Sequence, residues 1–258
     1  MEGLPTTIVV PCYNEAIRLD STSFLRFAGT AEDVRFIMVN DGSTDATGSV
    51  LARMCETSPH RFEQVDLAQN SGKGEAVRQG MQRAMAGRPA CIGFWDADLA
   101  TPLEAIARFR RVLAEHDEID VVLGSRIPLL GRSIQRHPMR SVLGRTFARA
   151  ASLILGLGMY DTQCGAKLFR ASHELWAVLF HPFLSRWVFD VELMARLAAV
   201  RGGPAVLRRS VYELPLDRWR EQPGSKLRAR HFAIAGLDLL RIRWNYSGAR
   251  AQQYVASL

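Results

Sequence analysis

Short apolar runs alternate with longer amphipathic segments over the first half of the chain. Runs rich in β-branched residues predict strands at 6–10, 34–39, 62–67, 90–95 and 120–124. Segments with helical spacing of apolar positions lie between them, at 15–28, 44–57, 72–87 and 101–115, where Thr101 and Pro102 suit a helix start. Strands that alternate with helices in this way predict an α/β fold, a mainly parallel sheet with helices on both faces.

The pattern is less regular after about residue 125. A loop rich in glycine and arginine at 124–137 precedes a helix near 138–156, and a turn is expected through 160–169. A helix near 187–201, a strand near 205–214 and a basic amphipathic segment at 218–244 follow. The last segment has two interpretations, a helix packed on the core or a helix at a membrane surface.

Polar segments follow four of the predicted strands. They are PCYNE (11–15), NDGSTD (40–45), NSGKG (70–74) and DAD (96–98). Because the carboxyl ends of parallel strands meet at one edge of an open α/β sheet, we expect these segments to lie together there, where such sheets bind ligands.

The segment DAD places two carboxylates, Asp96 and Asp98, at the end of an apolar run. Taken alone the pair fits solvated loop residues. Beside the other three polar segments it predicts a divalent cation, Mg²⁺ or Mn²⁺, which binds through one or two carboxylates and takes its other ligands from water and substrate phosphates.

Composition changes this picture in a few respects. The 258 residues are 48% hydrophobic, enough for one large globular domain, and the four cysteines are scattered without metal-ligand spacing. Only Lys73, Lys167 and Lys226 among the 33 basic residues are lysines, and each lies in a glycine-containing stretch that would suit phosphate oxygens. The net charge of +7 fits nucleic acid, anionic lipid or phosphorylated substrates.

Other features of the sequence narrow the classes of function that the composition allows. Neither a Walker loop nor a dinucleotide G-x-G-x-x-G is present, so a P-loop or NAD enzyme is not favoured. A nucleic-acid-binding protein would leave unexplained the carboxylates at the strand ends, which repel phosphates, and we expect no nucleic acid partner. No apolar run is long enough to span a membrane and the N-terminus lacks signal-peptide features, so we expect a cytoplasmic protein, or one peripheral on the cytoplasmic face of a membrane.

Seven segments in this order resemble a known family: VVPCYNE, VNDGSTDAT, NSGKGEAVRQGM, DADLATP, VLGSR, DTQCGAKLF and RWVFDVEL. They are similar to those of inverting glycosyltransferases with the GT-A (Rossmann-like) fold, and more narrowly to polyprenyl-phosphate sugar synthases such as the dolichyl-phosphate glucose and mannose synthases. The resemblance spans about residues 6–228. It implies a catalytic domain over 1–228, with a donor half at about 1–125, an acceptor half at about 126–228 and a helical membrane-facing region, followed by a basic tail at 229–258.

The resemblance also implies roles for individual residues. Asp96 and Asp98 would hold the metal, Asp98 where it bridges the donor diphosphate and Asp96 also beside the ribose. Arg126 and Arg140 would bind the acceptor phosphate and act in catalysis. The nucleotide sugar would be bound by Pro11, Tyr13, Glu15, Asp41, Lys73, Asp96 and Lys226.

Asp190 in RWVFDVEL is harder to assign. In related transferases that act on hydroxyl acceptors, a carboxylate near this position deprotonates the nucleophile. A phosphate acceptor, largely a dianion at neutral pH, needs no such base. We therefore expect Asp190 to orient the acceptor pocket or to pair with Arg186.

The expected reaction is transfer of a hexose, glucose from UDP-glucose in the first instance, to a polyprenyl phosphate with inversion. Ala100 stands where some mannose-transferring relatives carry a metal-contacting glutamine, which disfavours a GDP-mannose-dependent mannose synthase. A transferase acting on a saccharide hydroxyl, for which Asp190 would be the base, is the other alternative. A sugar-1-phosphate nucleotidyltransferase is disfavoured because PCYNE replaces its glycine-rich basic loop after the first strand.

Overall fold

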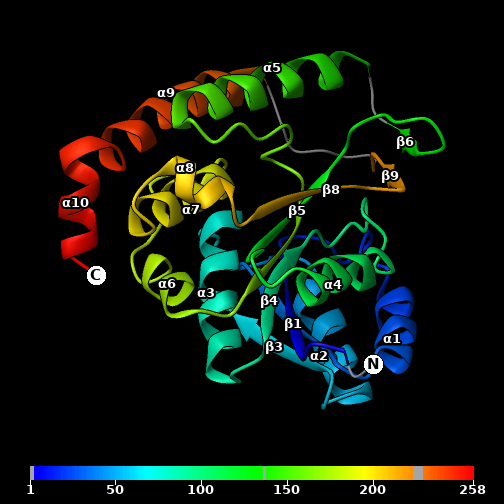
Figure 1. The fold of residues 1–258 in the computed structure, drawn as a ribbon. Coiled ribbons are helices and arrows are strands. Elements are labelled where there is room, and N and C mark those ends of the chain that lie inside the picture. The colour runs from blue at the N-terminus through cyan, green and yellow to red at the C-terminus, as the bar shows by residue number, and fades with distance from the viewer. Residues whose placement is uncertain (1–2, 136–137, 223–228) are drawn as a thin grey trace.

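A seven-stranded sheet runs through the middle of the molecule (Figure 1), in the order β3-β2-β1-β4-β7-β5-β8. The computed structural model describes residues 3–135, 138–222 and 229–258, without the side chains of 138–143, 145, 155 and 229–233. The strands are β1 (Thr6–Cys12), β2 (Val34–Asn40), β3 (Phe62–Asp66), β4 (Cys91–Trp95), β5 (Val121–Ser125), β7 (Ala166–Arg170) and β8 (Val211–Pro215). Every pairing is parallel except those of β7 with β4 and β5, which confirms the mainly parallel sheet.

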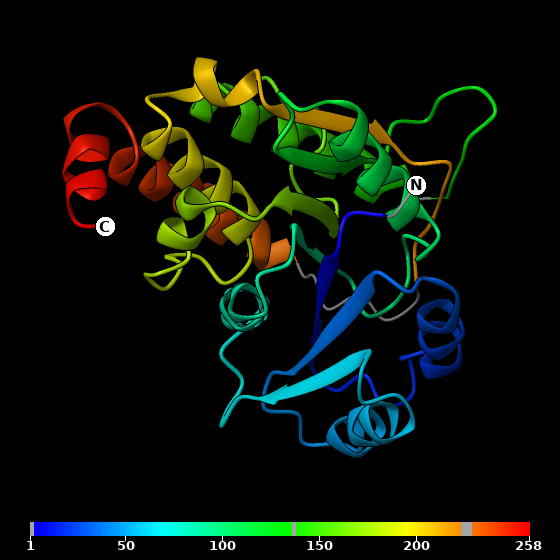
Figure 2. The same cartoon turned by 60° about the horizontal axis from the view of Figure 1, so that its bottom comes forward.

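Helices cover both faces of the sheet, as the alternating pattern predicts. On one face lie α1 (Ser21–Thr30), α2 (Thr47–Thr57) and α4 (Ala105–Glu115), which bury Phe24, Leu51 and Ile106. On the other face lie α3 (Lys73–Ala86), α6 (His173–Val178), α7 (Phe189–Val200) and α8 (Pro204–Arg208). Figure 2 shows α3 on the side of the sheet opposite to α1 and α2.

A further helical layer covers α7. The helices α5 (Pro138–Leu155) and α9 (Ala229–Asn245) run side by side (Figure 1), and α10 (Gly248–Ala256) follows α9. Buried side chains of the two helices, such as Ala151 and Leu239, pack against Val191 and Ala195 of α7. Because α7 is covered on two sides, nearly all of its side chains are buried, including those of the charged residues Asp190, Glu192 and Arg196. None of the helices in the described ranges is both long enough and apolar enough to cross a membrane.

Four sequence expectations need correction. The helix expected at 15–28 begins at Ser21, because the Asp20 side chain accepts from the Ser23 amide at 3.0 Å and caps it there. The helix expected from Thr101 begins at Ala105, because Thr101 is buried and its carbonyl accepts from the indole of Trp95 instead.

The other two corrections concern the second half of the chain. The strand expected at 205–214 begins only at Val211, because Pro204 occupies the first turn of the short helix α8. The turn expected through 160–169 contains the start of β7, a five-residue strand that inserts antiparallel between β4 and β5. A small second sheet pairs β6 (Ser133–Gln135) with β9 (Arg218–Arg220).

Candidate functional site

The loops after β1 and β2 lie against each other at one edge of the sheet. The two strands pair in register as far as Cys12 and Asn40, and the Asp41 amide donates to the Cys12 carbonyl at 2.8 Å. Asn14 fixes the two loops together, since its amide N–H donates to Ser43 Oγ at 3.0 Å and its Oδ1 accepts from the Thr44 amide at 2.8 Å. The predicted meeting of these two polar segments is therefore confirmed.

Asp96 and Asp98 lie at the same edge, directly after β4. Lys73 at the start of α3 forms an ion pair with Asp96, and Arg18 Nη2 lies 3.3 Å from Asp98 Oδ2. The two carboxylate side chains keep 33% and 26% exposure, and Leu99 beside them has the left-handed backbone angle φ +51°. Burial, and then the charge of Asp96, raise the pKa of Asp98. Such crowding of partly exposed carboxylates is typical of a cation site.

A glycine makes room for Asp96. A Cβ atom on Gly165 would lie 1.9 Å from Asp96 Oδ2, and the Gly165 carbonyl accepts from the Asp96 amide at 3.1 Å. The segment DTQCGAKLF therefore contributes to the site through the absence of a side chain. The sequence motif does not reveal this role of Gly165, because the contact depends on β7 pairing with β4.

Asp41 holds the loop that carries Lys73. Its Oδ1 accepts from the Ser71 amide at 2.7 Å, and its Oδ2 accepts from the Gly72 amide at 2.9 Å and from Asn70 Nδ2 at 3.1 Å. Burial raises the pKa of Asp41, and these hydrogen bonds oppose the shift without cancelling it. Arg186 Nη2 in turn donates to Asn70 Oδ1 at 2.8 Å, so the loop is held from both sides.

Asp190 is buried in the first turn of α7, and its partner is Lys167 rather than Arg186. Lys167 Nζ lies 3.3 Å from Asp190 Oδ2 and also donates to the Cys164 carbonyl at 2.6 Å. Burial raises the pKa of Asp190, while the charges of Lys167 and Lys73 oppose that shift. The expected pairing with Arg186 is therefore wrong. Sequence spacing could not reveal the Lys167 contact, which depends on β7 lying beneath α7.

Arg126 is held rigidly at the end of β5. Its Nε and Nη2 donate to the two carboxylate oxygens of Asp161 at 2.6 and 2.7 Å, and its guanidinium lies 5.3 Å from the Trp219 ring centre. This bidentate pair joins residues 35 positions apart, so sequence spacing does not reveal it. Asp161 accepts hydrogen bonds from Nε and Nη2 of Arg126 but not from its Nη1.

The remaining predicted residues divide into two groups. Pro11, Tyr13 and Glu15 are half-buried in the loop after β1. Arg140 lies in α5 but its side chain is not among those described, and Lys226 lies outside the described residues.

A second buried ion pair, also missed by sequence reasoning, lies further along α7. Arg196 Nη2 donates to Glu192 Oε1 at 2.7 Å and to the Pro182 carbonyl at 2.6 Å, and the Tyr246 hydroxyl also donates to Glu192. Glu192 Oε2 accepts from the amides of Leu184 and Ser185. This cluster fixes the loop before α7 and the end of α9 to the core. Its sequence signal was the i, i+4 spacing of opposite charges inside an apolar helix.

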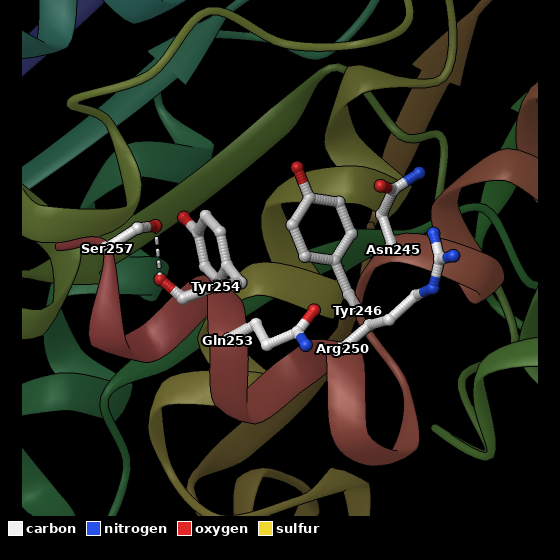
Figure 3. A pocket seen from close by; sticks show the side chains of 6 residues that line it. All are labelled: Asn245, Tyr246, Arg250, Gln253, Tyr254 and Ser257. Atoms are coloured by element: carbon white, nitrogen blue, oxygen red, sulfur yellow. Dashed lines mark hydrogen bonds between the residues drawn. The ribbon is translucent and has the colours of Figure 1, made fainter.

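A cavity of about 300 Å³ lies next to α10 (Figure 3), away from the motif residues. It is lined by Asn245, Tyr246, Arg250, Gln253, Tyr254 and Ser257. The Tyr246 and Tyr254 rings pack edge to face with centres 4.8 Å apart. None of the residues that the motifs single out lines this cavity, so the sheet edge remains the candidate active site.

The carboxylates at the sheet edge fit a divalent ion of a particular kind. Across the described part of the chain, no three His, Cys, Asp or Glu side chains gather as a metal cage. Asp96 and Asp98 offer two oxygen ligands, and Lys73 and Arg18 beside them suit phosphate oxygens. This donor set matches Mg²⁺ or Mn²⁺ completed by substrate phosphates, rather than zinc or a closed calcium site.

The sequence family and the fold together define a glycosyltransferase with the GT-A fold. Solved structures of glucosyl-3-phosphoglycerate synthase from Mycobacterium tuberculosis share the fold at 17–19% identity. The complex of that enzyme with Mn²⁺ and UDP-glucose has a TM-score of 0.64 and 18% identity, and the match covers 96% of this chain and 81% of that chain.

The chain belongs to glycosyl transferase family 2, which residues 7–176 match. Relatives named dolichyl-phosphate beta-glucosyltransferase are similar over most of the chain. The Dictyostelium discoideum protein is 30% identical over 263 residues, covering 95% of this chain and 76% of the relative. The Homo sapiens protein is 31% identical over 257 residues, covering 93% and 75%.

Proposed function

We propose that this protein transfers glucose from UDP-glucose to a polyprenyl phosphate, with inversion at the anomeric carbon and with a divalent ion bound at Asp96 and Asp98. One observation carries the proposal. Two cations, Lys73 and Arg18, flank the two carboxylates at the sheet edge, in a chain about 30% identical to proteins named dolichyl-phosphate beta-glucosyltransferase over more than 90% of its length.

The chemistry of the leaving group explains why the donor site needs both carboxylates, to hold the ion, and a nearby cationic side chain. Breaking the anomeric C–O bond leaves a nucleoside diphosphate with developing negative charge. The ion, Mg²⁺ or Mn²⁺, supplies Lewis-acid stabilisation of that charge. Lys73, with its ammonium beside Asp96, adds a second fixed positive charge. Asp41 contributes by holding the 70–72 backbone that carries Lys73.

The nucleoside would lie against the loop after β1. Pro11, Tyr13 and Glu15 are half-buried there, next to the Asp41 loop. We assign the donor to residues of the first half, about 1–125, and the acceptor to residues of 126–228. Lys226, assigned to the diphosphate by the family resemblance, belongs to the same proposal.

The acceptor phosphate needs positioning more than activation. A phosphate monoester is largely a dianion at neutral pH and attacks without a general base. Arg126 presents its Nη1 edge while Asp161 fixes its other two nitrogens, which gives a preorganised donor for phosphate. Arg140 of α5 is the second proposed phosphate contact.

The position of Asp190 supports a mechanism without a base. Its side chain is 8% exposed and paired with Lys167, whose side chain has no exposure. A base for a hydroxyl acceptor needs access to the acceptor and freedom to take its proton. The arrangement therefore favours phosphate over the saccharide hydroxyl as the acceptor.

The α5–α9 layer offers the surface for a lipid acceptor. On α9 the outward residues Leu237, Leu240 and Trp244 are 58–64% exposed, and Leu153 on α5 is 81% exposed. The Arg241 side chain on the same helix is 70% exposed. An apolar stripe with arginines suits the boundary of an anionic bilayer, so we place the enzyme peripherally on the cytoplasmic face of a membrane.

The deciding experiment offers radiolabelled UDP- and GDP-sugars to a short polyprenyl phosphate, with Mg²⁺, with Mn²⁺ and with EDTA. Metal-dependent transfer from UDP-glucose to lipid is the expected result. Transfer from GDP-mannose alone would move the chain to the mannose branch. Slow donor hydrolysis with no labelled lipid would keep the donor site and overturn the acceptor roles of Arg126 and Arg140.

A further inference from the structure

Arg18 is a basic residue at the sheet edge that none of the motif assignments includes. It lies in the turn between β1 and α1, where its amide donates to the Glu15 carbonyl at 2.9 Å. Its side chain reaches across the fold to a residue 80 positions away, with Nη2 3.3 Å from Asp98 Oδ2. Its Nε lies 3.5 Å from Glu15 Oε2.

Stability alone does not account for this contact. The Arg18 side chain is 29% exposed and that of Asp98 26% exposed, and an ion pair that water still reaches contributes only modestly to folding. Asp98 is already oriented by a second contact, because its Oδ1 accepts from the Ala100 amide at 3.1 Å. The Arg18 guanidinium therefore contacts the Asp98 carboxylate although it is not needed to orient it.

The neighbouring charges indicate what Arg18 can bind. Lys73 stands at Asp96 and Arg18 at Asp98, so the carboxylate pair is bracketed by two cations from different loops. A guanidinium carries five N–H donors in a planar fork that matches phosphate oxygens. A diphosphate held by an ion at Asp98 would lie within reach of this fork.

We propose that Arg18 is a donor-binding residue that grips the diphosphate of the nucleotide sugar and, through its positive charge, weakens binding of a divalent ion to Asp98 when no nucleotide is present. The inference rests on the proposed donor site. It makes ion binding depend on the nucleotide: the diphosphate supplies ligands to the ion and at the same time takes over the Arg18 contact.

The inference predicts effects of opposite sign from one substitution. In Arg18→Gln, the Mn²⁺ affinity measured without nucleotide should rise about 3- to 10-fold, because one nearby like charge is removed from a partly solvated site. The affinity for UDP at saturating Mn²⁺ should fall about 10- to 100-fold, because charge-assisted hydrogen bonds to phosphate are lost. A purely structural role would lower both affinities or neither.

The test uses the full chain and two binding assays. Free Mn²⁺ is measured by electron paramagnetic resonance, and UDP binding by titration calorimetry. Arg26→Gln is the matched control, since Arg26 is an exposed α1 residue whose Nη2 donates to Ser23 Oγ at 3.1 Å, and it should behave as the unchanged protein. Arg18→Lys keeps the charge and should restore the weak Mn²⁺ affinity with only part of the UDP affinity.

Where both variants fold, three results for them would overturn the inference. They are unchanged UDP affinity in Arg18→Gln, equal losses of both affinities in a variant with unchanged thermal unfolding, and an Arg18→Lys protein that behaves like Arg18→Gln. If Arg18→Gln does not fold, Arg18→Lys alone carries the comparison, and UDP affinity equal to that of the unchanged protein would then count against the proposal. An unchanged protein that binds UDP and Mn²⁺ but labels no lipid would overturn the acceptor assignment and leave this inference standing. Absence of any UDP binding by the unchanged protein would overturn both.

Discussion

Two lysine–aspartate pairs stand at different depths in the same site. Lys73 and Asp96 meet at the sheet edge, where their side chains keep 37% and 33% exposure. Lys167 and Asp190 meet beneath α7, with 0% and 8% exposure. The same chemical pair therefore serves two purposes. At the edge, each side chain keeps access to solvent, so under the proposed function it can exchange its contact for an ion or a phosphate. In the interior, neither partner can leave without stranding a buried charge.

The largest expected effect is a loss of transfer rate on substitution of an aspartate at the sheet edge. Asp98→Asn should reduce transfer at least about 10³-fold, because the ion loses a charged ligand at the position where negative charge develops. Initial rates of lipid labelling at saturating metal measure the loss. Asp117→Asn is the control, since the Asp117 side chain is fully exposed and the change should leave the rate unaltered.

Substitutions in the buried pair of Lys167 and Asp190 should lower the stability of the protein more than its turnover rate. Lys167→Met leaves Asp190 buried without its partner and should cost about 3–5 kcal/mol in the free energy of unfolding. The double variant Lys167→Met/Asp190→Leu should recover part of that loss, as urea unfolding of the three proteins would show.

Asp190→Asn separates this structural role from catalysis. We expect it to reduce transfer only modestly in the fraction of protein that remains folded. A loss of transfer as large as that of Asp98→Asn, with unchanged stability, would instead make Asp190 the catalytic base and return the hydroxyl acceptor to first place.

Substitution of Gly165, which lies against Asp96, should have an intermediate effect on the transfer rate. Gly165→Ala forces the Asp96 carboxylate away from its position, and displacement of a catalytic group by about 1 Å costs on the order of 10²-fold in rate. Gly29→Ala is the matched control, since nothing lies within 4 Å of a Cβ at Gly29. Equal activity of the two variants would show that the Asp96 position is not critical.

The smallest effect is a pair of opposite pH dependences. Burial raises the pKa of Asp161, but the charge and hydrogen bonds of Arg126 outweigh it, so the pKa lies below its usual value. Asp161 therefore adds stability above its unfolded pKa of about 3.9, and this contribution is lost as the pH falls through its lower folded pKa. The stability difference between the unchanged protein and Asp161→Asn should shrink on acidification.

Asp190 should show the reverse. Its folded pKa is raised by burial, so the folded state binds the proton more readily than the unfolded state does. As the pH falls from above the folded pKa towards about 3.9, the unchanged protein should gain stability relative to Asp190→Asn. Urea midpoints measured from pH 7 to pH 3 would check both slopes, and parallel curves for the two variants would contradict the assignment.

Much of the donor half could be predicted from the chain alone. The five expected strands appear as β1 to β5, and the polar segments after β1 and β2 meet as expected. Both follow from local pattern, because alternating strands and helices admit few topologies and parallel strands bring their carboxyl ends together. The two aspartates after β4 and the glycine-flanked Lys73 belong to the same pattern.

The contacts of the acceptor half could not be predicted in this way. β7 was expected to be a turn, the pairing of Asp190 with Arg186, one of two roles expected for it, was wrong, and Asp161 and Gly165 were not assigned. In the donor half, Arg18 was likewise not assigned. Each of these depends on segments far apart in the chain: Lys167 reaches Asp190 only because β7 inserts between β4 and β5 beneath α7.

The sequence by itself thus determined the α/β fold, the family and the carboxylates at the sheet edge, because these depend on periodicity and on short motifs. Only the tertiary structure decided which cation stands beside which carboxylate and how much water each pair retains. Charge interactions depend on distance and burial, and neither is a property of sequence spacing. That difference is what separates the exchangeable pair at Asp96 from the fixed pair at Asp190.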